Sequence, residues 1–395
     1  MKPEVTARII LKKSKIESIE RFHPWIFSGA IKNIEGKPED GDLVEVYDHH
    51  DKFLGIGFYA PQTIAVRLLS FTPVDDVEKL IEEKIFNAFL LRKQLNLYSP
   101  QNNAFRLVYA EGDLLPGLIA DYYNGLLMIE YHARGMEKLE KILINAFLKL
   151  RDYLPMHHMV TYFKSHPAEK LNKQVVWGNG HLDPVINFQE NGYTFLLPWH
   201  DGQKTGFFLD QRENRKLLER ISHGRDVLNM FCYTGSFSIY ALKGGARSVV
   251  SVDSSEKALH LYKQTLDING LPEQPAVEAD AMNYLTELET NTFDLIILDP
   301  PAFAKHIENR HHALLGYKRI NAAALSKIRK GGYLLTFSCS QAISFTQFQG
   351  AVTSAAIQAK RHVRVLAHLS QAHCHAYSIF HPEGSYLKGL WLYVE

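Results

Sequence analysis

The order of apolar and polar positions divides the chain into three parts, and the first part contains only strand-like runs. Short segments of strand character, separated by turn residues, occur at 8–11, 41–48, 53–59 and 64–69. Several short strands in succession are typical of a small barrel. We therefore expect an all-β barrel domain over residues 1–72.

The second part mixes helical and strand-like patterns. Apolar residues recur at helical spacing over 74–95, and another amphipathic helix is expected at 137–150. Strand-like runs, with turn dipeptides between them, lie at 105–109, 118–121, 126–131 and between 160 and 177. These elements predict a central α+β domain over residues 73–186. No residue in it is a candidate for a catalytic role.

The third part alternates buried-type strands with helices, after a hairpin-like pair of runs at 188–195. Its apolar strand runs lie at 226–231, 248–252, just before 278, 293–298 and 332–337. This alternation predicts an α/β domain with a doubly wound, Rossmann-like sheet over residues 187–395. Ligands of such sheets bind at the carboxyl ends of the strands, so the residues that follow each strand are the first candidates for a site.

A tight turn follows the first strand of this sheet. Tyr233, Thr234 and Gly235 lead from the strand, which ends at Phe231, into a helix. Such a turn lets backbone amides approach a small ligand, and the helix N-terminus favours negative charge. These four residues are therefore candidate cofactor contacts.

Acidic residues follow the second and third strands. Asp253 lies about twenty residues beyond the turn, where a carboxylate can accept hydrogen bonds from both hydroxyls of a ribose. Together with Glu256 it also forms a capping-box pattern, and both roles can hold at once. Asp280 could bind an adenine amino group or be a simple turn residue. Ser254 and Ala281 follow these acids and are included as cofactor candidates.

The fourth strand delivers the most specific motif. Asp299 is followed by Pro300, Pro301 and, after one residue, Phe303. The prolines fix the backbone and hold the carboxylate out of the sheet, while the phenyl ring offers a flat face to a base. An Asp-Pro-Pro motif after a strand resembles the substrate motif of methyltransferases that use S-adenosylmethionine on nucleobases or amides.

A thiol follows the fifth strand. Cys339 reaches the carboxyl edge, near Asp299 if the fourth and fifth strands are neighbours. Cytosine C5 is a poor nucleophile, but addition of a thiolate to C6 makes C5 enamine-like and able to attack a methyl sulfonium. A lone cysteine is also a common buried filler. Its position beside the Asp-Pro-Pro motif favours the nucleophile.

These segments closely resemble the bacterial 23S (large-subunit) ribosomal RNA cytosine-C5 methyltransferases that carry an N-terminal PUA domain, a class I S-adenosylmethionine-dependent family. The resemblance runs in the family's order across nearly the whole chain, through residues 21–30, 204–212, 229–235, 299–301 and 337–340. Two positions depart from the usual patterns: Ser236 stands where a second glycine is common, and Leu114 stands where a glycine usually precedes Leu-Pro-Gly.

The resemblance adds a second group of cofactor candidates before the first strand. Lys204, Thr205, Gln211 and Arg212 could hold the methionine carboxylate of S-adenosylmethionine. The other interpretation is a helix start in which Asp210 is an ordinary N-cap.

Overall charge neither supports nor excludes a nucleic-acid partner. The 395 residues carry a formal net charge of +1, so any RNA surface has to be local. Basic and aromatic residues gather near the start of the barrel, where they could pair with phosphates and stack on bases. The candidates are Lys12, Lys13, Arg21, His23 and Trp25. A solvated rim around an aromatic core is the alternative, and the resemblance to PUA domains, which bind RNA, favours the first interpretation.

The number and spacing of cysteines and histidines argue against a disulfide framework and against a metal site. Three cysteines, at 232, 339 and 374, are too few and too far apart for a disulfide framework, and we expect a cytoplasmic protein. Neither a signal peptide nor a membrane span is expected.

The cluster of His373, Cys374, His375 and His381 lacks a second ligand pair, so no metal is predicted. Histidines and basic residues at 306–319 predict a mobile substrate loop.

The leading hypothesis is cytosine-C5 methylation in 23S ribosomal RNA, with Cys339 adding to C6 and Asp299 bonding the N3 edge. One alternative is methylation of guanine N7 or an exocyclic amine, which needs no thiol. Another is an RNA-binding or ribosome-assembly factor without catalysis. A dehydrogenase is disfavoured because no G-x-G-x-x-G follows the first strand. The oligomeric state is not determined by the sequence, and a homodimer is one option.

Overall fold

The computed structural model describes residues 4–163, 172–178, 180–200, 206–304 and 307–395. They group into two compact units. The first contains residues 1–192, 197–209 and 373–384, and the second contains 193–196, 210–372 and 385–395. Each unit is described by itself.

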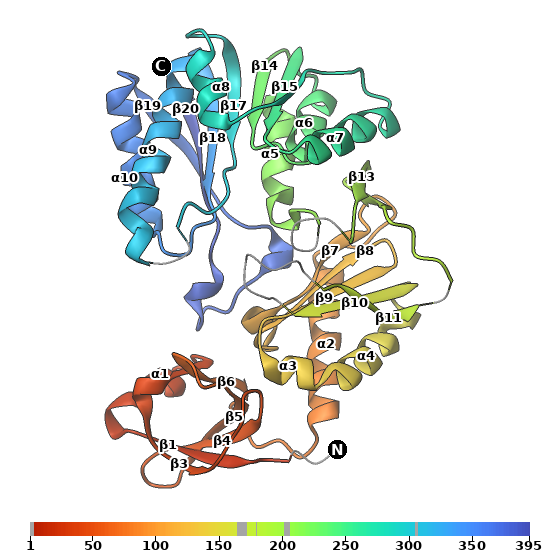
Figure 1. Cartoon of the computed structure of the whole chain (residues 1–395), viewed down its shortest axis with the longest axis vertical. Coiled ribbons are helices and arrows are strands. Elements are labelled where there is room, and N and C mark those ends of the chain that lie inside the picture. The colour runs from red at the N-terminus through yellow and green to blue at the C-terminus, as the bar shows by residue number, and fades with distance from the viewer. Residues whose placement is uncertain (1–3, 164–171, 179, 201–205, 305–306) are drawn as a thin grey trace. The chain divides into compact units, whose positions relative to one another are not determined.

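The first unit begins with a six-stranded barrel-like sheet in the order β2-β6-β5-β4-β1-β3 (Figure 1). Its elements are β1 (Ala7–Leu11), α1 (Glu17–Glu20), β2 (Trp25–Phe27), β3 (Ile31–Gly36), β4 (Leu43–Tyr47), β5 (Phe53–Tyr59) and β6 (Ile64–Ser70). The four strands predicted in this region are confirmed. The sequence did not indicate β2 and β3, which place few residues in the core and so lack a clear apolar period.

The first unit also contains a five-stranded sheet of order β11-β10-β9-β8-β7 (Figure 1). Its strands are β7 (Ala104–Tyr109), β8 (Leu118–Tyr123), β9 (Leu126–Tyr131), β10 (His158–Phe163) and β11 (Gln174–Gly178), and its helices are α2 (Val77–Gln94), α3 (Arg134–Lys138) and α4 (Glu140–Leu148). Leu114, at the unusual position, adopts the left-handed φ of 58° that a glycine would adopt more easily.

The second unit is a seven-stranded sheet of order β16-β15-β14-β17-β18-β20-β19 (Figure 1). Its strands are β14 (Asp226–Met230), β15 (Ser248–Asp253), β16 (Ala276–Glu278), β17 (Phe293–Leu298), β18 (Ile328–Ser338), β19 (Val363–Leu369) and β20 (Lys388–Val394). Its helices are α5 (Arg212–Ile221), α6 (Ser236–Lys243), α7 (Glu256–Ile268), α8 (Ala281–Glu287), α9 (Arg310–Lys327) and α10 (Phe345–Gln358). The pair of strands expected at 188–195 is β12 (Ile186–Glu190), which belongs to the first unit, and β13 (Tyr193–Leu197), most of which belongs to the second.

Successive residues of the central strands enter two separate cores. Leu228 of β14 and Leu298 of β17 pack in one core together with α9 and α10. Val227 of β14 and Ile297 of β17 pack in the other core, together with α5 and α6. Because side chains alternate across a strand, a sheet covered on both faces requires continuous apolar runs. The prediction of a doubly wound sheet is confirmed.

Two features of this unit were not expected. β20 lies between β18 and β19 and is antiparallel to both, although it comes last in the chain. The prediction of a mobile loop over 306–319 is wrong from Arg310 onward, because the helix α9 begins there. The reason is that Ala313, Tyr317 and Ile320 recur at helical spacing and are buried against the sheet.

Two acids at the amino ends of the strands are paired with two arginines. Asp226 accepts hydrogen bonds from Arg247 Nε at 2.8 Å and from Arg329 at 2.8 Å. Arg329 also lies 3.0 Å from Asp294. The hydrogen bond from Arg247, together with those from Arg329 and Ser248, holds the pKa of Asp226 well below its usual range.

We expect the substitution Asp226→Asn to destabilise the second unit by about 2 kcal/mol near neutral pH, since it removes hydrogen bonds to a charged group. A depressed pKa in the folded state stabilises the fold above the unfolded pKa of about 3.9 and loses that effect as the pH falls toward the folded value. The difference from wild type should therefore be full above about pH 5 and shrink below about pH 4. Hydrogen exchange of peptides covering β14 and β17 at each pH measures it. Asp267→Asn, on the exposed face of α7, is the control and should change little.

Candidate cofactor and catalytic site

The carboxyl ends of five parallel strands form one rim of the sheet in the second unit. Met230 of β14 pairs with Val252 of β15 and with Leu298 of β17, and Leu298 in turn pairs with Thr336 of β18. β16 adds Glu278, opposite Asp253. The residues that follow these strands therefore lie along the same edge, where a doubly wound sheet binds its ligand.

The turn after β14 has an unusual backbone. Phe231, Tyr233 and Gly235 have φ values of 57°, 50° and 74°. Left-handed conformations are rare for residues with a side chain and persist where the surroundings enforce them, often at functional sites. Here the amide of Tyr233 donates to Asp253 Oδ2 at 2.8 Å, which ties the turn to the end of β15. Thr234 is buried within the turn.

Asp253 does not cap the following helix. The N-cap of α7 is Ser255, whose hydroxyl accepts the amide of Ala258 at 3.3 Å, so the capping interpretation of Asp253 is wrong. Asp253 Oδ1 instead accepts the amide of Ser255 at 3.0 Å. Each carboxylate oxygen has a further lone pair, so the partly exposed group keeps the capacity to accept hydrogen bonds from ribose hydroxyls. Ser254, beside it, is exposed.

Asp280 does have a local structural role. It is the N-cap of α8, and its carboxylate accepts the amide of Asn283 at 3.0 Å. Ala281 is the first residue of that helix. Asp280 is exposed at the end of the rim, and contact with an adenine amino group stays a prediction.

The residues before the first strand are only partly described. Lys204 and Thr205 lie outside the described residues, as does His306. Gln211 and Arg212 are both buried at the start of α5. Asp210 is not the N-cap, because that position is Gln211; its carboxylate accepts the hydroxyl of Tyr386 instead.

Cys339 and Asp299 follow neighbouring strands. β17 and β18 pair in parallel, which is the condition that the sequence left open. The Cys339 thiol lies 3.9 Å from the carbonyl oxygen of Pro300, the residue after Asp299. Both residues are partly exposed. Asp299 and Cys339 therefore follow neighbouring strand ends on the same rim, and their joint action on one nucleobase stays a prediction.

The other two cysteines have different surroundings. Cys232 and Cys374 are buried, whereas Cys339 has intermediate exposure. Burial raises the pKa of the Cys232 thiol well above its usual range, an effect that the charge of Asp253 strengthens. Cys339 is thus the cysteine in this chain with access for chemistry.

The motif after Asp299 packs partly inward. Pro300 is buried and Pro301 is exposed. The ring of Phe303 lies 4.6 Å from that of Tyr317 on α9, centroid to centroid, so it is partly engaged in packing. A ring held in this way can still present its other face or edge to a base.

Three residues at this end of the sheet, Tyr317, Ser340 and Lys388, were not proposed as site residues from the sequence. The Ser340 hydroxyl is hydrogen-bonded to Tyr317 at 2.9 Å and accepts the amide of Ala304 at 3.3 Å. Lys388 donates to the carbonyl oxygen of Ser340 at 2.8 Å. In the sequence, Lys388 is only a lysine that precedes an apolar run. Its position at this rim follows from the antiparallel pairing of β20 with β18.

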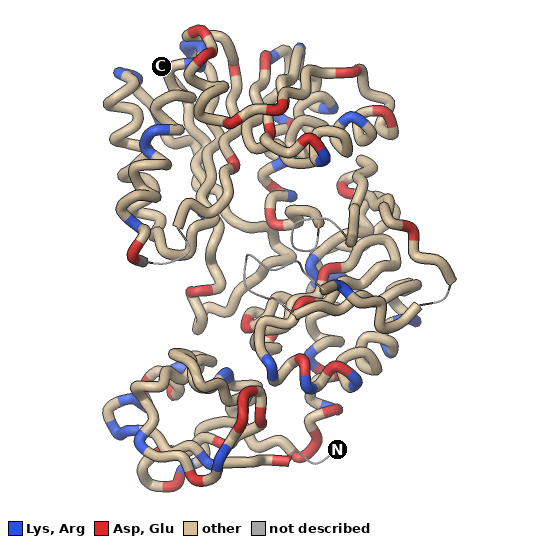
Figure 2. The backbone as a smooth tube through the Cα atoms, in the orientation of Figure 1, with Lys and Arg blue, Asp and Glu red and all other residues tan. Residues whose placement is uncertain are grey.

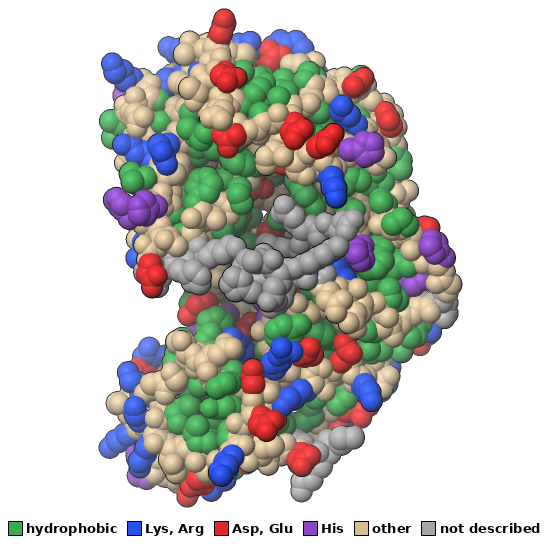
Figure 3. All heavy atoms as spheres, in the orientation of Figure 1, with side chains coloured by type: hydrophobic (Ala, Val, Ile, Leu, Met, Phe, Trp, Pro, Cys, Tyr) green, Lys and Arg blue, Asp and Glu red, His purple; other side chains and the backbone are tan. Residues whose placement is uncertain are grey.

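The basic candidates of the barrel are at its surface. Lys13 and Arg21 are exposed, with Arg21 paired to Glu17, and Lys12 donates to the carbonyl oxygen of Gly29 at 2.9 Å. Figure 2 shows Lys and Arg interspersed with Asp and Glu along the barrel backbone. Figure 3 shows both basic and acidic side chains around an apolar area on this face of the barrel. Contact of these basic residues with RNA stays a prediction.

His23 and Trp25 use their polar atoms within the first unit. The indole nitrogen of Trp25 donates to Glu111 at 2.7 Å. The ring of His23 accepts the amide of Trp25 at 3.2 Å, and its Nε2 lies 3.3 Å from Glu383. Both side chains are half-buried, so their contact with RNA stays a prediction.

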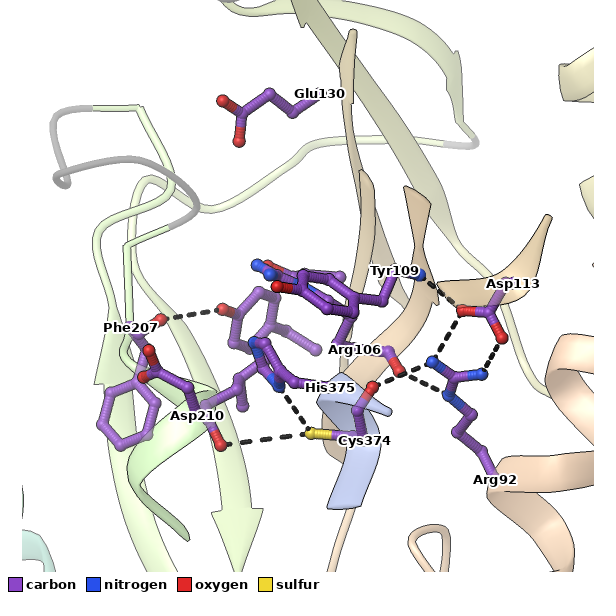
Figure 4. Close-up of polar contacts among 12 residues, drawn as sticks. Arg92, Arg106, Tyr109, Asp113, Glu130, Phe207, Asp210, Cys374 and His375 are labelled. Atoms are coloured by element: carbon purple, nitrogen blue, oxygen red, sulfur yellow. Dashed lines mark hydrogen bonds and ion pairs between the residues drawn. The ribbon is translucent and has the colours of Figure 1, made fainter. Parts of the chain in front are cut away.

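The segment His373–Gly384 belongs to the first unit. Its anchor is the fully buried Arg92, whose guanidinium donates to Asp113 at 2.8 Å and to the carbonyl oxygen of Cys374 at 2.8 Å (Figure 4). Cys374 Sγ lies 3.2 Å from His375 Nδ1. Among the described residues, no group of three or more His, Cys, Asp or Glu side chains is placed to hold a metal ion.

None of the described helices combines the length and apolar character needed to cross a bilayer.

Comparison with known proteins gives concordant results. A PUA-like domain model matches residues 9–71, and a model described as S-adenosylmethionine-dependent methyltransferase matches residues 118–363. Proteins named ribosomal RNA large subunit methyltransferase I are similar: that of Alteromonas mediterranea is 36% identical, covering 98% of each chain, and that of Tolumonas auensis is 36% identical, covering 98% of this chain and 99% of its own.

Solved structures show the same fold. A protein from Streptococcus mutans described as a SAM-dependent methyltransferase has a TM-score of 0.84 at 21% identity, covering 98% of this chain and 99% of its own. A methyltransferase structure with bound SAH has a TM-score of 0.85 at 22% identity, with the same coverage. The expectation of an S-adenosylmethionine-dependent α/β fold behind a PUA-like domain is confirmed.

Gly235 provides a test of the cofactor site. A Cβ atom there would lie 2.0 Å from the ring of Tyr262, and φ is 74°. We expect Gly235→Ala to weaken S-adenosylhomocysteine binding, measured by calorimetry, by at least about tenfold, because the turn must shift. Gly270→Ala is the matched control: φ is 61° but the position is open, so it imposes similar backbone strain without the clash. Equal losses in both variants would mean that the turn is not the binding site.

Proposed function

Because the chain belongs to the S-adenosylmethionine-dependent methyltransferases, the family that includes the ribosomal RNA large subunit methyltransferase I proteins, we propose that it methylates C5 of a cytosine in 23S ribosomal RNA. The relatives' name and their coverage of the whole chain support the large-subunit RNA as substrate. The observation that carries the choice of base is the partly exposed Cys339 beside the Asp-Pro-Pro motif.

The first step is covalent. The Cys339 thiolate adds to C6 of the cytosine, and the electron pair of the C5–C6 double bond becomes available at C5. Asp299, in its protonated form, donates a hydrogen bond to the N3 edge and so stabilises the negative charge that develops in the ring. S-Adenosylmethionine supplies an electrophilic methyl group for the second step.

The second step forms the product. C5 takes the methyl group, a base removes the proton from C5, and the C5–C6 double bond is restored as Cys339 leaves. The partly exposed position of Cys339 suits a target cytosine that is splayed out of its stack, since a stacked cytosine does not expose C6 to a protein side chain.

The cofactor in this proposal lies along the rim from β14 to β16. Phe231, Tyr233, Thr234 and Gly235 contact it through the turn. Asp253 and Ser254 bind the ribose, Asp280 and Ala281 face the adenine, and the methionine carboxylate is held by Lys204, Thr205, Gln211 and Arg212. Pro300, Pro301 and Phe303 face the target base.

The base and the mechanism are tested together. We expect Cys339→Ala to reduce formation of 5-methylcytidine in ribosomal RNA by at least about a thousandfold, because it removes the nucleophile. Mass spectrometry of nucleosides after reaction with deproteinised or partly assembled large-subunit RNA measures the product. Cys374→Ala, which removes a buried thiol of the first unit, should keep most of the turnover.

The other outcomes separate the alternatives. Methylation that survives in Cys339→Ala would instead indicate guanine N7 or an exocyclic amine as the acceptor. Absence of methyl transfer to any base by the wild-type protein would favour a non-catalytic RNA-binding or assembly factor. An RNA containing 5-fluorocytidine at the target should form a covalent complex with wild type, because the fluorine cannot leave as a proton does.

The barrel, residues 1–72, is proposed to bind the RNA through Lys12, Lys13, Arg21, His23 and Trp25, with residues 73–186 as a linking domain. We expect the triple substitution of Lys12, Lys13 and Arg21 by Gln to weaken RNA binding by about tenfold or more at moderate salt. It should also make the negative slope of log K against log salt shallower, by about one for each phosphate that the variant no longer neutralises. Fluorescence anisotropy at several KCl concentrations measures both.

The control changes charge equally elsewhere in the first unit. Lys79, Lys93 and Lys141 are exposed and can be replaced by Gln together. If this variant weakens binding as much as the barrel variant, the effect reflects net charge and the barrel is not the contact surface.

A further inference from the structure

Lys388 is a buried cation placed against the strand that carries the proposed nucleophile. It begins β20, where it pairs with Ser338 in the antiparallel ladder between β18 and β20. Its ammonium donates to the carbonyl oxygen of Ser340 at 2.8 Å. The side chain therefore reaches from its position opposite Ser338 to the residue that follows Cys339.

Burial of this lysine has an electrostatic consequence. Its exposed fraction is 8%, and a carbonyl oxygen carries only a partial charge. Burial lowers the pKa of Lys388 to about 8, and negative charge on Cys339 acts in the opposite direction. The influence is mutual: an ammonium that is stabilised by a thiolate also stabilises that thiolate.

Two other titratable groups at this strand end, among those that the structure describes, do not supply positive charge. Tyr317 on α9 faces the same strand end through Ser340, and burial raises the pKa of its hydroxyl, which keeps it neutral. Asp299, at the end of β17, is an acid and supplies no positive charge either. Negative charge near Cys339 would disfavour its thiolate form, and a nearby cation would favour it. Lys388 lies where it offsets that effect.

We propose that Lys388 is a positioning residue whose ammonium group keeps Cys339 in the thiolate form and fixes the strand end that carries it. The thiol proton passes to water and the ammonium keeps its own proton, so no further reactant is required. The use made of the thiolate rests on the proposed function, but its formation needs neither RNA nor cofactor. The inference can therefore be tested on the free protein.

The rate of alkylation by iodoacetamide between pH 5 and pH 10 reports the thiolate fraction at Cys339. The modified peptide is quantified by mass spectrometry in the full-length protein, in which the other cysteines are buried. In wild type the midpoint should lie below about 8.5, the value of an ordinary thiol. Lys388→Met should raise it by about one pH unit or more, so that alkylation at pH 7 slows by about tenfold.

Variants separate the charge from the packing. Methionine keeps most of the volume of lysine and removes a desolvated charge, so the fold should be retained; Lys388→Gln takes its place if Lys388→Met does not fold. Lys388→Arg keeps the charge and should keep the midpoint close to that of wild type. Lys330→Met, on an exposed position at the other end of β18, should leave it unchanged.

An unchanged midpoint in folded Lys388→Met overturns the proposal. A uniform change in rate at every pH also overturns it, because that result reflects altered access to the sulfur and not altered ionisation. The outcome is independent of the proposed function. A shifted midpoint in a protein that makes no 5-methylcytidine would refute the assigned reaction and leave the role of Lys388 standing.

Discussion

The parallel pairing of β17 with β18 is the constraint on which the site depends. It places the residue after Leu298 and the residues after Thr336 on one rim, so that Asp299 and Cys339 follow the ends of neighbouring strands. This register is difficult to shift. Alternate residues of both strands enter different cores, so a slip by one position would turn each side chain to the wrong layer. The apolar packing of the sheet thus sets the strand ends from which Asp299 and Cys339 follow.

A second constraint holds the turn after β14. Phe231 and Tyr233 adopt left-handed backbone conformations, which cost on the order of 1–3 kcal/mol each. The amide of Tyr233 is bound by Asp253, and the ring of Tyr262 fills the space where any larger residue than Gly235 would place its Cβ. The turn is therefore held in one conformation before a ligand arrives, which lowers the entropic cost of binding.

Much of this arrangement could be predicted from the sequence. Continuous apolar runs identified β14, β15 and β17, and the residues after them were readable as a rim because parallel strands end at a common edge. The antiparallel insertion of β20 could not be derived, since strand order depends on packing between segments far apart in the chain. Lys388 was missed for that reason: in sequence it is one lysine before an apolar run, and only the pairing with Ser338 brings it to Cys339. The helix α9 was missed although its spacing was present, because the basic residues after Asp-Pro-Pro favoured a loop.

The acids at the two ends of the sheet are held by different donors, and this difference has a chemical consequence. At the amino ends, Asp226 and Asp294 are bound by the guanidinium groups of Arg247 and Arg329, which neutralise them. On the carboxyl rim, Asp253 and Asp280 accept backbone amides, which orient a carboxylate without cancelling its charge. A rim that keeps negative charge attracts hydroxyl donors and the sulfonium cation of S-adenosylmethionine. It would by the same field oppose ionisation of a thiol, so a chemistry that needs a thiolate at this edge requires a local cation.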